Sequence, residues 1–203
     1  MRTESLLRAV TLSATMLYCA SAAAQTSASQ EIEIYGGEMS GDRLTEAAIS
    51  GARPRLDDTA TFGARYTYNF TDMWGIQLGG GYSPSRASHV FSGDSNLGLT
   101  TLDADVVWNF TPGYRIVGYT TAGVGYAWAN LDRAIMGAVS ARPVAILDSN
   151  SFTANAGIGG KYYVTSNLFI DVGARFRYLN RIVSSYQQGM NTAETTIGVG
   201  WRF

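Results

Sequence analysis

The last ten residues of the chain, 194–203, alternate strictly between apolar side chains and polar or small ones. Ile197, Val199, Trp201 and Phe203 occupy every second position, and the positions between them hold glycine or arginine. A period of two is typical of a β-strand, because successive side chains of a strand point to opposite faces of the sheet. This segment therefore predicts a strand with one apolar face and one polar face.

The same alternation recurs along the chain in segments of about ten residues, the length that a tilted strand needs to cross a membrane. In each segment one face is apolar and often aromatic, and the other carries polar residues, charges and glycine. The predicted strands are 31–37, 59–70, 74–82, 99–110, 114–128, 151–164, 168–178 and 194–203. The pattern predicts an all-β protein.

The connections between these segments alternate in length. Three are tight turns (71–73, 111–113 and 165–167), and the others span roughly 12 to 21 residues. Outer-membrane barrels separate their connections in this way, with short turns at one rim and long loops at the other, whereas a soluble sandwich or lipocalin-like barrel has no reason to do so. We predict an eight-stranded antiparallel up-and-down transmembrane β-barrel with both termini at the rim of the short turns.

Composition agrees with this prediction. Charged residues make up 15% of the 203 residues, below the roughly 25% of ordinary soluble domains, and aromatic residues reach 12%. Beyond the N-terminus no apolar run is long enough for a spanning helix. The formal net charge of −1 argues against a nucleic-acid partner.

The first 24 residues have the features of a secretory signal peptide. Arg2 and Arg8 provide positive charge, an apolar stretch follows at 9–20, and the alanines at 22–24 form a cleavage site. We expect residues 1–24 to be removed and residues 25–203 to form the barrel. The only cysteine, Cys19, lies in the signal peptide, so disulfides are not expected in the mature chain. A signal peptide before a barrel pattern predicts location in a Gram-negative outer membrane.

The predicted inward faces collect acidic and basic residues in nearly equal numbers. They are Glu33, Arg65, Asp103, Asp105, Arg115, Lys161, Asp171, Arg175, Arg177, Glu194 and Arg202. Because the interior of an eight-stranded barrel is only just wide enough for its own side chains, these charges must pair or stay hydrated. Two interpretations are open: a packed ion-pair core that fills the lumen, or a narrow polar conduit that a rotamer change opens.

Four stretches carry a resemblance to a known family: 63–72 (GARYTYNFTD), 79–82 (GGGY), 122–126 (AGVGY) and 198–203 (GVGWRF). They resemble the small outer-membrane barrels that include the transmembrane domain of OmpA and the OmpX/Ail and OmpW-like proteins. The resemblance covers the mature chain and implies surroundings of outer-membrane lipid and lipopolysaccharide. It also implies that the barrel-assembly machinery recognises a terminal aromatic signal, here Trp201 and Phe203. OmpA carries a peptidoglycan-binding domain after its barrel, and we expect no wall tethering of that kind here.

Enzymatic chemistry is not expected. The single histidine, His89, lies near Ser88 and Ser92 in the second long connection, and such a loop histidine is usually a solvated residue. Outer-membrane lipid A deacylases resemble this chain in size and use a histidine, a serine and an acid, but their motif is absent. No metal-ligand cluster or phosphate loop is present, so no cofactor is predicted.

The third long connection is unusually apolar for an exposed segment. Its apolar residues are Leu131, Ile135, Met136, Val139, Val144, Ile146 and Leu147. Either the flanking strands extend beyond the membrane and this segment packs on itself, or an exposed apolar patch contacts a host surface, an envelope partner or a hydrophobic ligand.

These observations predict a structural and surface-contact role for the outer-membrane barrel, of the adhesin or resistance type, exercised through its extracellular loops. The alternative is a narrow channel for small polar or hydrophobic solutes, as the OmpW-like proteins imply.

Overall fold

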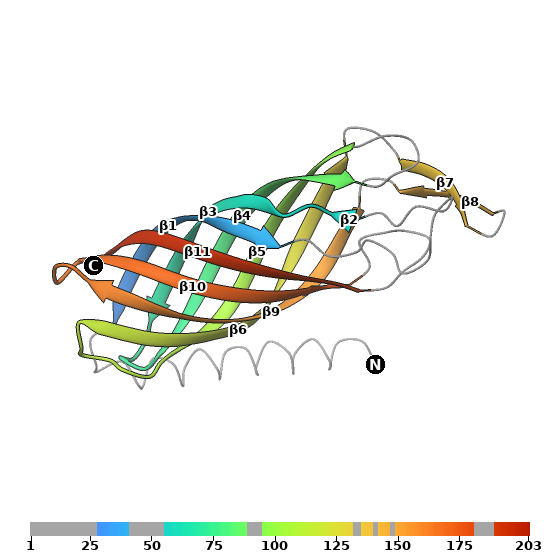
Figure 1. Ribbon diagram of the computed structural model, residues 1–203. Coiled ribbons are helices and arrows are strands. Elements are labelled where there is room, and N and C mark those ends of the chain that lie inside the picture. The colour runs from blue at the N-terminus through green and yellow to red at the C-terminus, as the bar shows by residue number, and fades with distance from the viewer. Residues whose placement is uncertain are drawn as a thin grey trace, which may run out of the picture.

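Each of the eight predicted segments forms a strand, and the eight strands pair edge to edge into a closed barrel (Figure 1). The computed structural model describes residues 28–40, 55–88, 95–131, 135–139, 142–146, 149–180 and 189–203. The strands of the barrel are β1 (Ser29–Ser40), β3 (Thr59–Asn69), β4 (Trp74–Ser88), β5 (Ser95–Asn109), β6 (Ile116–Leu131), β9 (Ser149–Tyr163), β10 (Leu168–Leu179) and β11 (Met190–Arg202). All neighbours are antiparallel, so the predicted fold class is confirmed.

The first and last strands close the ring. β1 pairs with β3 on one side and with β11 on the other, and β4 pairs with β5. Every strand of the barrel therefore has two neighbours, which satisfies the backbone hydrogen bonds without a free sheet edge. No helix among the described residues is long and apolar enough to cross a membrane.

Three short connections, 70–73, 110–115 and 164–167, lie at one end of the barrel, which we call the turn end; the opposite end is the loop end. A threonine side chain fixes each of these turns: the Trp74 amide donates to Thr71 Oγ1 at 2.9 Å, the Gly118 amide donates to Thr111 Oγ1 at 2.7 Å, and the Leu168 amide donates to Thr165 Oγ1 at 2.9 Å. In the turn at 110–115, Gly113 also has a φ of +84°, a left-handed conformation that favours glycine.

At the loop end several strands extend beyond their predicted boundaries. β4 continues to Ser88 and β5 begins at Ser95, with Arg86 still paired to Asn96, whereas the sequence predicted boundaries at 82 and 99. The prediction followed the apolar outward face, which ends before the backbone pairing does. Two further elements lie in the long connections: β2 (Arg55–Leu56), which pairs with β4, and the hairpin of β7 (Ile135–Val139) and β8 (Arg142–Ile146).

The two faces of the barrel have the polarity opposite to that of a soluble globule. Outward side chains such as Ile34 and Val124 are 68% and 64% exposed, while Glu33 and Asp171 on the inner face are 4% and 0% exposed. Exposed aromatic rings cluster at the turn end, where Trp74 stacks on Trp108 with centroids 6.1 Å apart. An apolar outer surface with aromatic rings near its edge is the surface that a bilayer covers.

Candidate functional site

The interior charges are arranged in three levels along the barrel axis. At the turn-end level, Lys161 on β9 forms an ion pair with Glu31 on β1, and the hydroxyl of Tyr163 donates to Glu31 Oε1 at 2.8 Å. The Lys161 ammonium also lies 5.4 Å from the ring centre of the fully buried Phe169. This level thus pairs one acid with one base.

The middle level is centred on Arg65 of β3. Its Nη1 atom lies 3.0 Å from Glu33 Oε1 and 3.7 Å from Asp171 Oδ1, and its guanidinium lies 4.0 Å from the centre of the Tyr35 ring. Glu33 is the direct register partner of Arg65 on the neighbouring strand. The hydroxyl of Tyr119 donates to Asp171 Oδ1 at 2.9 Å, which fixes the second carboxylate.

The upper level is a bridge across the lumen made by Arg175 of β10. Its Nη1 lies 3.1 Å from Asp103 Oδ2, and its Nη2 lies 2.8 Å from Asp105 Oδ2, both on β5. The same Nη2 donates to Gln77 Oε1 on β4 at 3.2 Å. One buried guanidinium therefore joins three strands.

Arg177 extends this level toward β11. Its Nη2 lies 2.6 Å from Asp103 Oδ2, and its Nη1 forms an ion pair with Glu194. Asp103 is thus shared by two arginines. The upper level is a chain of ion pairs in which acids on β5 and β11 flank the arginines of β10. Removing one member of such a buried set leaves an uncompensated charge, which costs about 3–5 kcal/mol.

Inward glycines make room for this level. A Cβ atom on Gly123 would collide with the carbonyl oxygen of Ala104 and with the Asp105 carboxylate, and one on Gly125 would collide with Asp103. The absence of side chains on this part of β6 lets the two carboxylates lie against the wall.

An apolar layer covers the upper level on the loop side. It consists of inward side chains from β1, β5, β10 and β11, all nearly or fully buried, and we call it the loop-end apolar layer. Its members are Met39, Leu97, Leu99, Leu179 and Met190. This layer was not predicted from the sequence, because its positions lie at or beyond the ends of the predicted strands.

The predicted interior residues fall into three groups. Nine are buried inside the barrel and belong to the three levels: Glu33, Arg65, Asp103, Asp105, Lys161, Asp171, Arg175, Arg177 and Glu194. Arg202 is half-buried at the turn-end mouth, with its guanidinium 5.8 Å from the centre of the Tyr163 ring.

The inward placement of Arg115 was wrong. The residue is exposed, because β6 begins at Ile116 and Arg115 still belongs to the preceding turn, where its carbonyl accepts from the Tyr163 amide at 2.9 Å. Glu31 was not predicted as an interior residue, although the alternation of β1 places it on the same face as Glu33.

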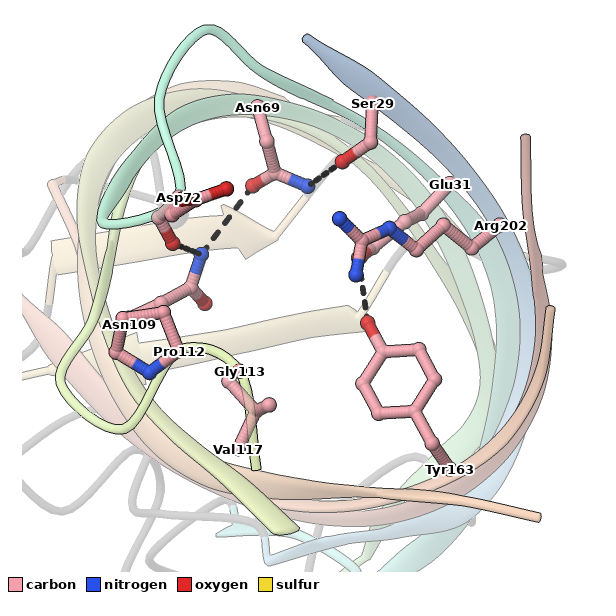
Figure 2. A pocket seen from close by; sticks show the side chains of 10 residues that line it. All are labelled: Ser29, Glu31, Asn69, Asp72, Asn109, Pro112, Gly113, Val117, Tyr163 and Arg202. Carbon is pink, nitrogen blue, oxygen red and sulfur yellow. Dashed lines mark hydrogen bonds between the residues drawn. The ribbon is translucent and has the colours of Figure 1, made fainter. Parts of the chain in front are cut away.

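Two small cavities lie between described residues of the lumen. Figure 2 shows a polar cavity at the turn-end mouth, of about 40 Å³, between Glu31 and Tyr163 on one side and a set of amides on the other. There Asn109 Nδ2 donates to Asn69 Oδ1 at 3.3 Å, and Asn69 Nδ2 donates to Ser29 Oγ at 3.3 Å. A second cavity beside Arg65 measures about 10 Å³, which is the size of one water molecule.

The other predicted sites lie at the ends of the barrel. Trp201 and Phe203, the predicted assembly signal, are exposed on the outer face at the turn end. Of the predicted surface-contact residues, Leu131 ends β6, Ile135, Met136 and Val139 lie on β7, and Val144 and Ile146 lie on β8, where Ile135 pairs with Ile146. Leu147, His89 and Ser92 lie outside the described residues, and Ser88 ends β4. In the part of the chain that the structure describes, no group of three or more histidine, cysteine or acidic residues could hold a metal ion.

Comparison with known proteins agrees with this architecture. A family model described as the outer membrane protein beta-barrel domain matches residues 10–203. The fold is similar to that of Neisserial surface protein A, with a TM-score of 0.57 and 16% identity over 87% of this chain and 99% of that one. It is also similar to OprG from Pseudomonas aeruginosa (TM-score 0.53, 16% identity, 88% and 98% covered). A third similar structure is Ail, the attachment invasion locus protein of Yersinia pestis (TM-score 0.51, 16% identity, 88% and 100% covered).

No match was found among curated proteins. Identities this low show the shared fold alone, whereas the family model spans nearly the whole chain. The inverted polarity, the closed ring of eight strands and the matching model lead to one conclusion: the chain belongs to the outer membrane protein β-barrel family and resides in the outer membrane of a Gram-negative bacterium.

Proposed function

We propose that this protein is a closed scaffold that presents its loop-end segments for contact with a partner outside the cell, and that it acts neither as a channel nor as an enzyme. The observation that carries this proposal is the bridge across the lumen. Arg175 joins β10 to Asp103 and Asp105 on β5 and to Gln77 on β4, so a buried guanidinium occupies the centre of the barrel.

The levels above and below this bridge support a closed lumen. Arg65 with its two carboxylates fills the section beneath it, and the loop-end apolar layer lies above it. An ion that crosses this level meets buried apolar side chains and the hydroxyls of Ser83 and Ser85, which replace little of its hydration shell, so the crossing is costly. For the described interior, the packed ion-pair core is therefore favoured over the polar conduit.

The loop end supports a contact role. β6 and β9 remain paired as far as Ala129 and Ser149, and the β7–β8 hairpin extends from this wall beyond the barrel (Figure 1). Connections on a rigid barrel are the positions where binding residues concentrate. The apolar composition of this hairpin suits a protein surface of the host or of the envelope.

Two measurements test the proposal. In planar bilayers the purified protein should produce no discrete steps in ion current. Steady current steps whose conductance differs between the wild type and Arg175→Gln would favour the channel. Bacteria that display the protein should bind host extracellular matrix, and replacing residues 132–148 with a Gly-Ser linker should abolish binding.

The matched control replaces residues 41–54, in the first long connection, with the same kind of linker. This variant should bind as well as the wild type. Binding that persists without residues 132–148, at equal surface levels of the protein, would contradict a contact role for the hairpin.

A further inference from the structure

A polar cleft crosses the turn-end rim of the barrel, outside the three charged levels. It has a volume of about 370 Å³ and lies between the turn at 110–115, the turn at 164–167 and the end of β11. Arg115 and Arg202 line it together with Thr165, Ser166 and the ring of Tyr163. The turns are held together by the Tyr163 amide, which donates to the Arg115 carbonyl at 2.9 Å, and by the Arg202 amide, which donates to the Asn167 carbonyl at 2.7 Å.

The two arginines of this cleft differ from the buried bases. Arg65, Lys161, Arg175 and Arg177 each form an ion pair with a carboxylate, whereas Arg115 and Arg202 form none with any described residue. The adjoining mouth cavity contains Glu31 and Asp72. Glu31 is already bound by Lys161 and Tyr163, so it does not neutralise Arg202. The cleft therefore carries two positive charges that no ion pair with a described residue neutralises.

The donors that line the cleft match a phosphate group. A guanidinium presents several N–H donors in a planar fork that fits phosphate oxygens. The Thr165 oxygen accepts from the Leu168 amide at 2.9 Å, which leaves its own hydroxyl proton able to donate to a ligand. Two arginines and one threonine thus line a space of about 370 Å³, which is large enough for a phosphodiester and part of its glycerol.

The position of the cleft indicates where this phosphate comes from. Tyr114 and Val164 line the cleft and are 74% and 40% exposed, so the cleft opens over the rim onto the lipid-facing surface. The exposed Tyr162 and Phe203 lie near the same rim, at the level where aromatic side chains meet lipid headgroups. We propose that the cleft binds the phosphate of an anionic phospholipid in the adjoining leaflet, with Arg115 and Arg202 as its phosphate ligands.

Native mass spectrometry of the folded barrel in mixed micelles tests this assignment, with phosphatidylglycerol and phosphatidylcholine as probes. The wild type should retain phosphatidylglycerol in preference to phosphatidylcholine, because the amine of the latter offsets its phosphate charge. Arg115→Gln and Arg202→Gln should each lower retention of phosphatidylglycerol about tenfold. Arg142→Gln, which removes the same charge from β8 at the loop end, should leave retention unchanged.

Each remaining outcome has a defined meaning. Equal retention by the wild type and by both Arg115→Gln and Arg202→Gln, or an equal loss in Arg142→Gln, would overturn the site. Displacement of the lipid by inorganic phosphate at equal concentration would overturn the lipid assignment and leave a free-anion site. If Arg202→Gln does not fold, as judged by heat-modifiable migration on gels, Arg115→Gln carries the test alone, because Arg115 is exposed and lies outside the strands.

Discussion

Arg175 Nη2 lies 2.8 Å from Asp105 Oδ2, although two strands, β6 and β9, separate β10 from β5 around the barrel. The contact therefore spans the lumen instead of following the wall. Most interior pairs of a sheet involve register neighbours, such as Glu33 and Arg65. A pair across the lumen fixes the distance between two parts of the barrel wall and also contributes to the stability of the fold.

The first prediction concerns this pair. Arg175→Leu leaves two buried carboxylates without their shared base, so we expect the free energy of unfolding to fall by about 3 kcal/mol. Restoring neutrality with Asp105→Asn in the same protein should recover part of the loss, with a coupling energy of about 1–3 kcal/mol. Urea unfolding in lipid vesicles measures both values, and additive effects would show that the two groups do not interact.

A second prediction distinguishes two glycines on neighbouring strands. Gly123→Ala on β6 should destabilise the barrel by about 1–3 kcal/mol, because the new methyl group meets the backbone oxygen of Ala104. Gly160→Ala on β9 is the control: a Cβ there meets no atom within 4 Å, so stability should change by less than about 0.5 kcal/mol. Equal effects of the two changes would contradict the packing described for β6.

The third prediction tests the surroundings of the outer face. Val124 lies near the middle of β6 and is 64% exposed, so Val124→Arg should cost about 2–4 kcal/mol in a bilayer. Tyr114→Arg at the turn-end rim should cost only about 0–1 kcal/mol, since headgroups and water solvate the charge there. Equal costs at the two depths in vesicle unfolding would rule out a bilayer covering Val124.

The fourth prediction concerns assembly in cells. Phe203→Ala should lower the amount of folded protein in the outer membrane, because the aromatic residue is the proposed recognition signal, while refolding into detergent in vitro proceeds as in the wild type. Phe176→Ala removes an exposed ring from the lipid-facing surface of β10 and should leave cellular assembly rates intact. The two variants are compared by quantifying heat-modifiable protein in membrane fractions; similar losses would assign no special role to Phe203.

The strands of the barrel wall are well predicted from the sequence, because outward side chains that contact lipid are mostly apolar. Apolar residues at every second position therefore identify both the strands and their lipid-facing side. It predicts less where that constraint ends. Arg115 was placed inward by extending the alternation into a turn, and the loop-end apolar layer was not predicted because its residues lie at or beyond the ends of the predicted strands. Which acid pairs with which base, as in Arg175 with Asp105, depends on the curvature of the closed ring, and no local pattern encodes it.

The pairing of β1 with β11 has a kinetic consequence. Glu31 is the register partner of Arg202, so the seam joins residues that lie far apart in the sequence. Contacts so distant in sequence carry a high loop-closure entropy and form late. Until β11 is available to pair with it, β1 therefore keeps one row of backbone amides and carbonyls without partners, and this open edge can pair with another chain.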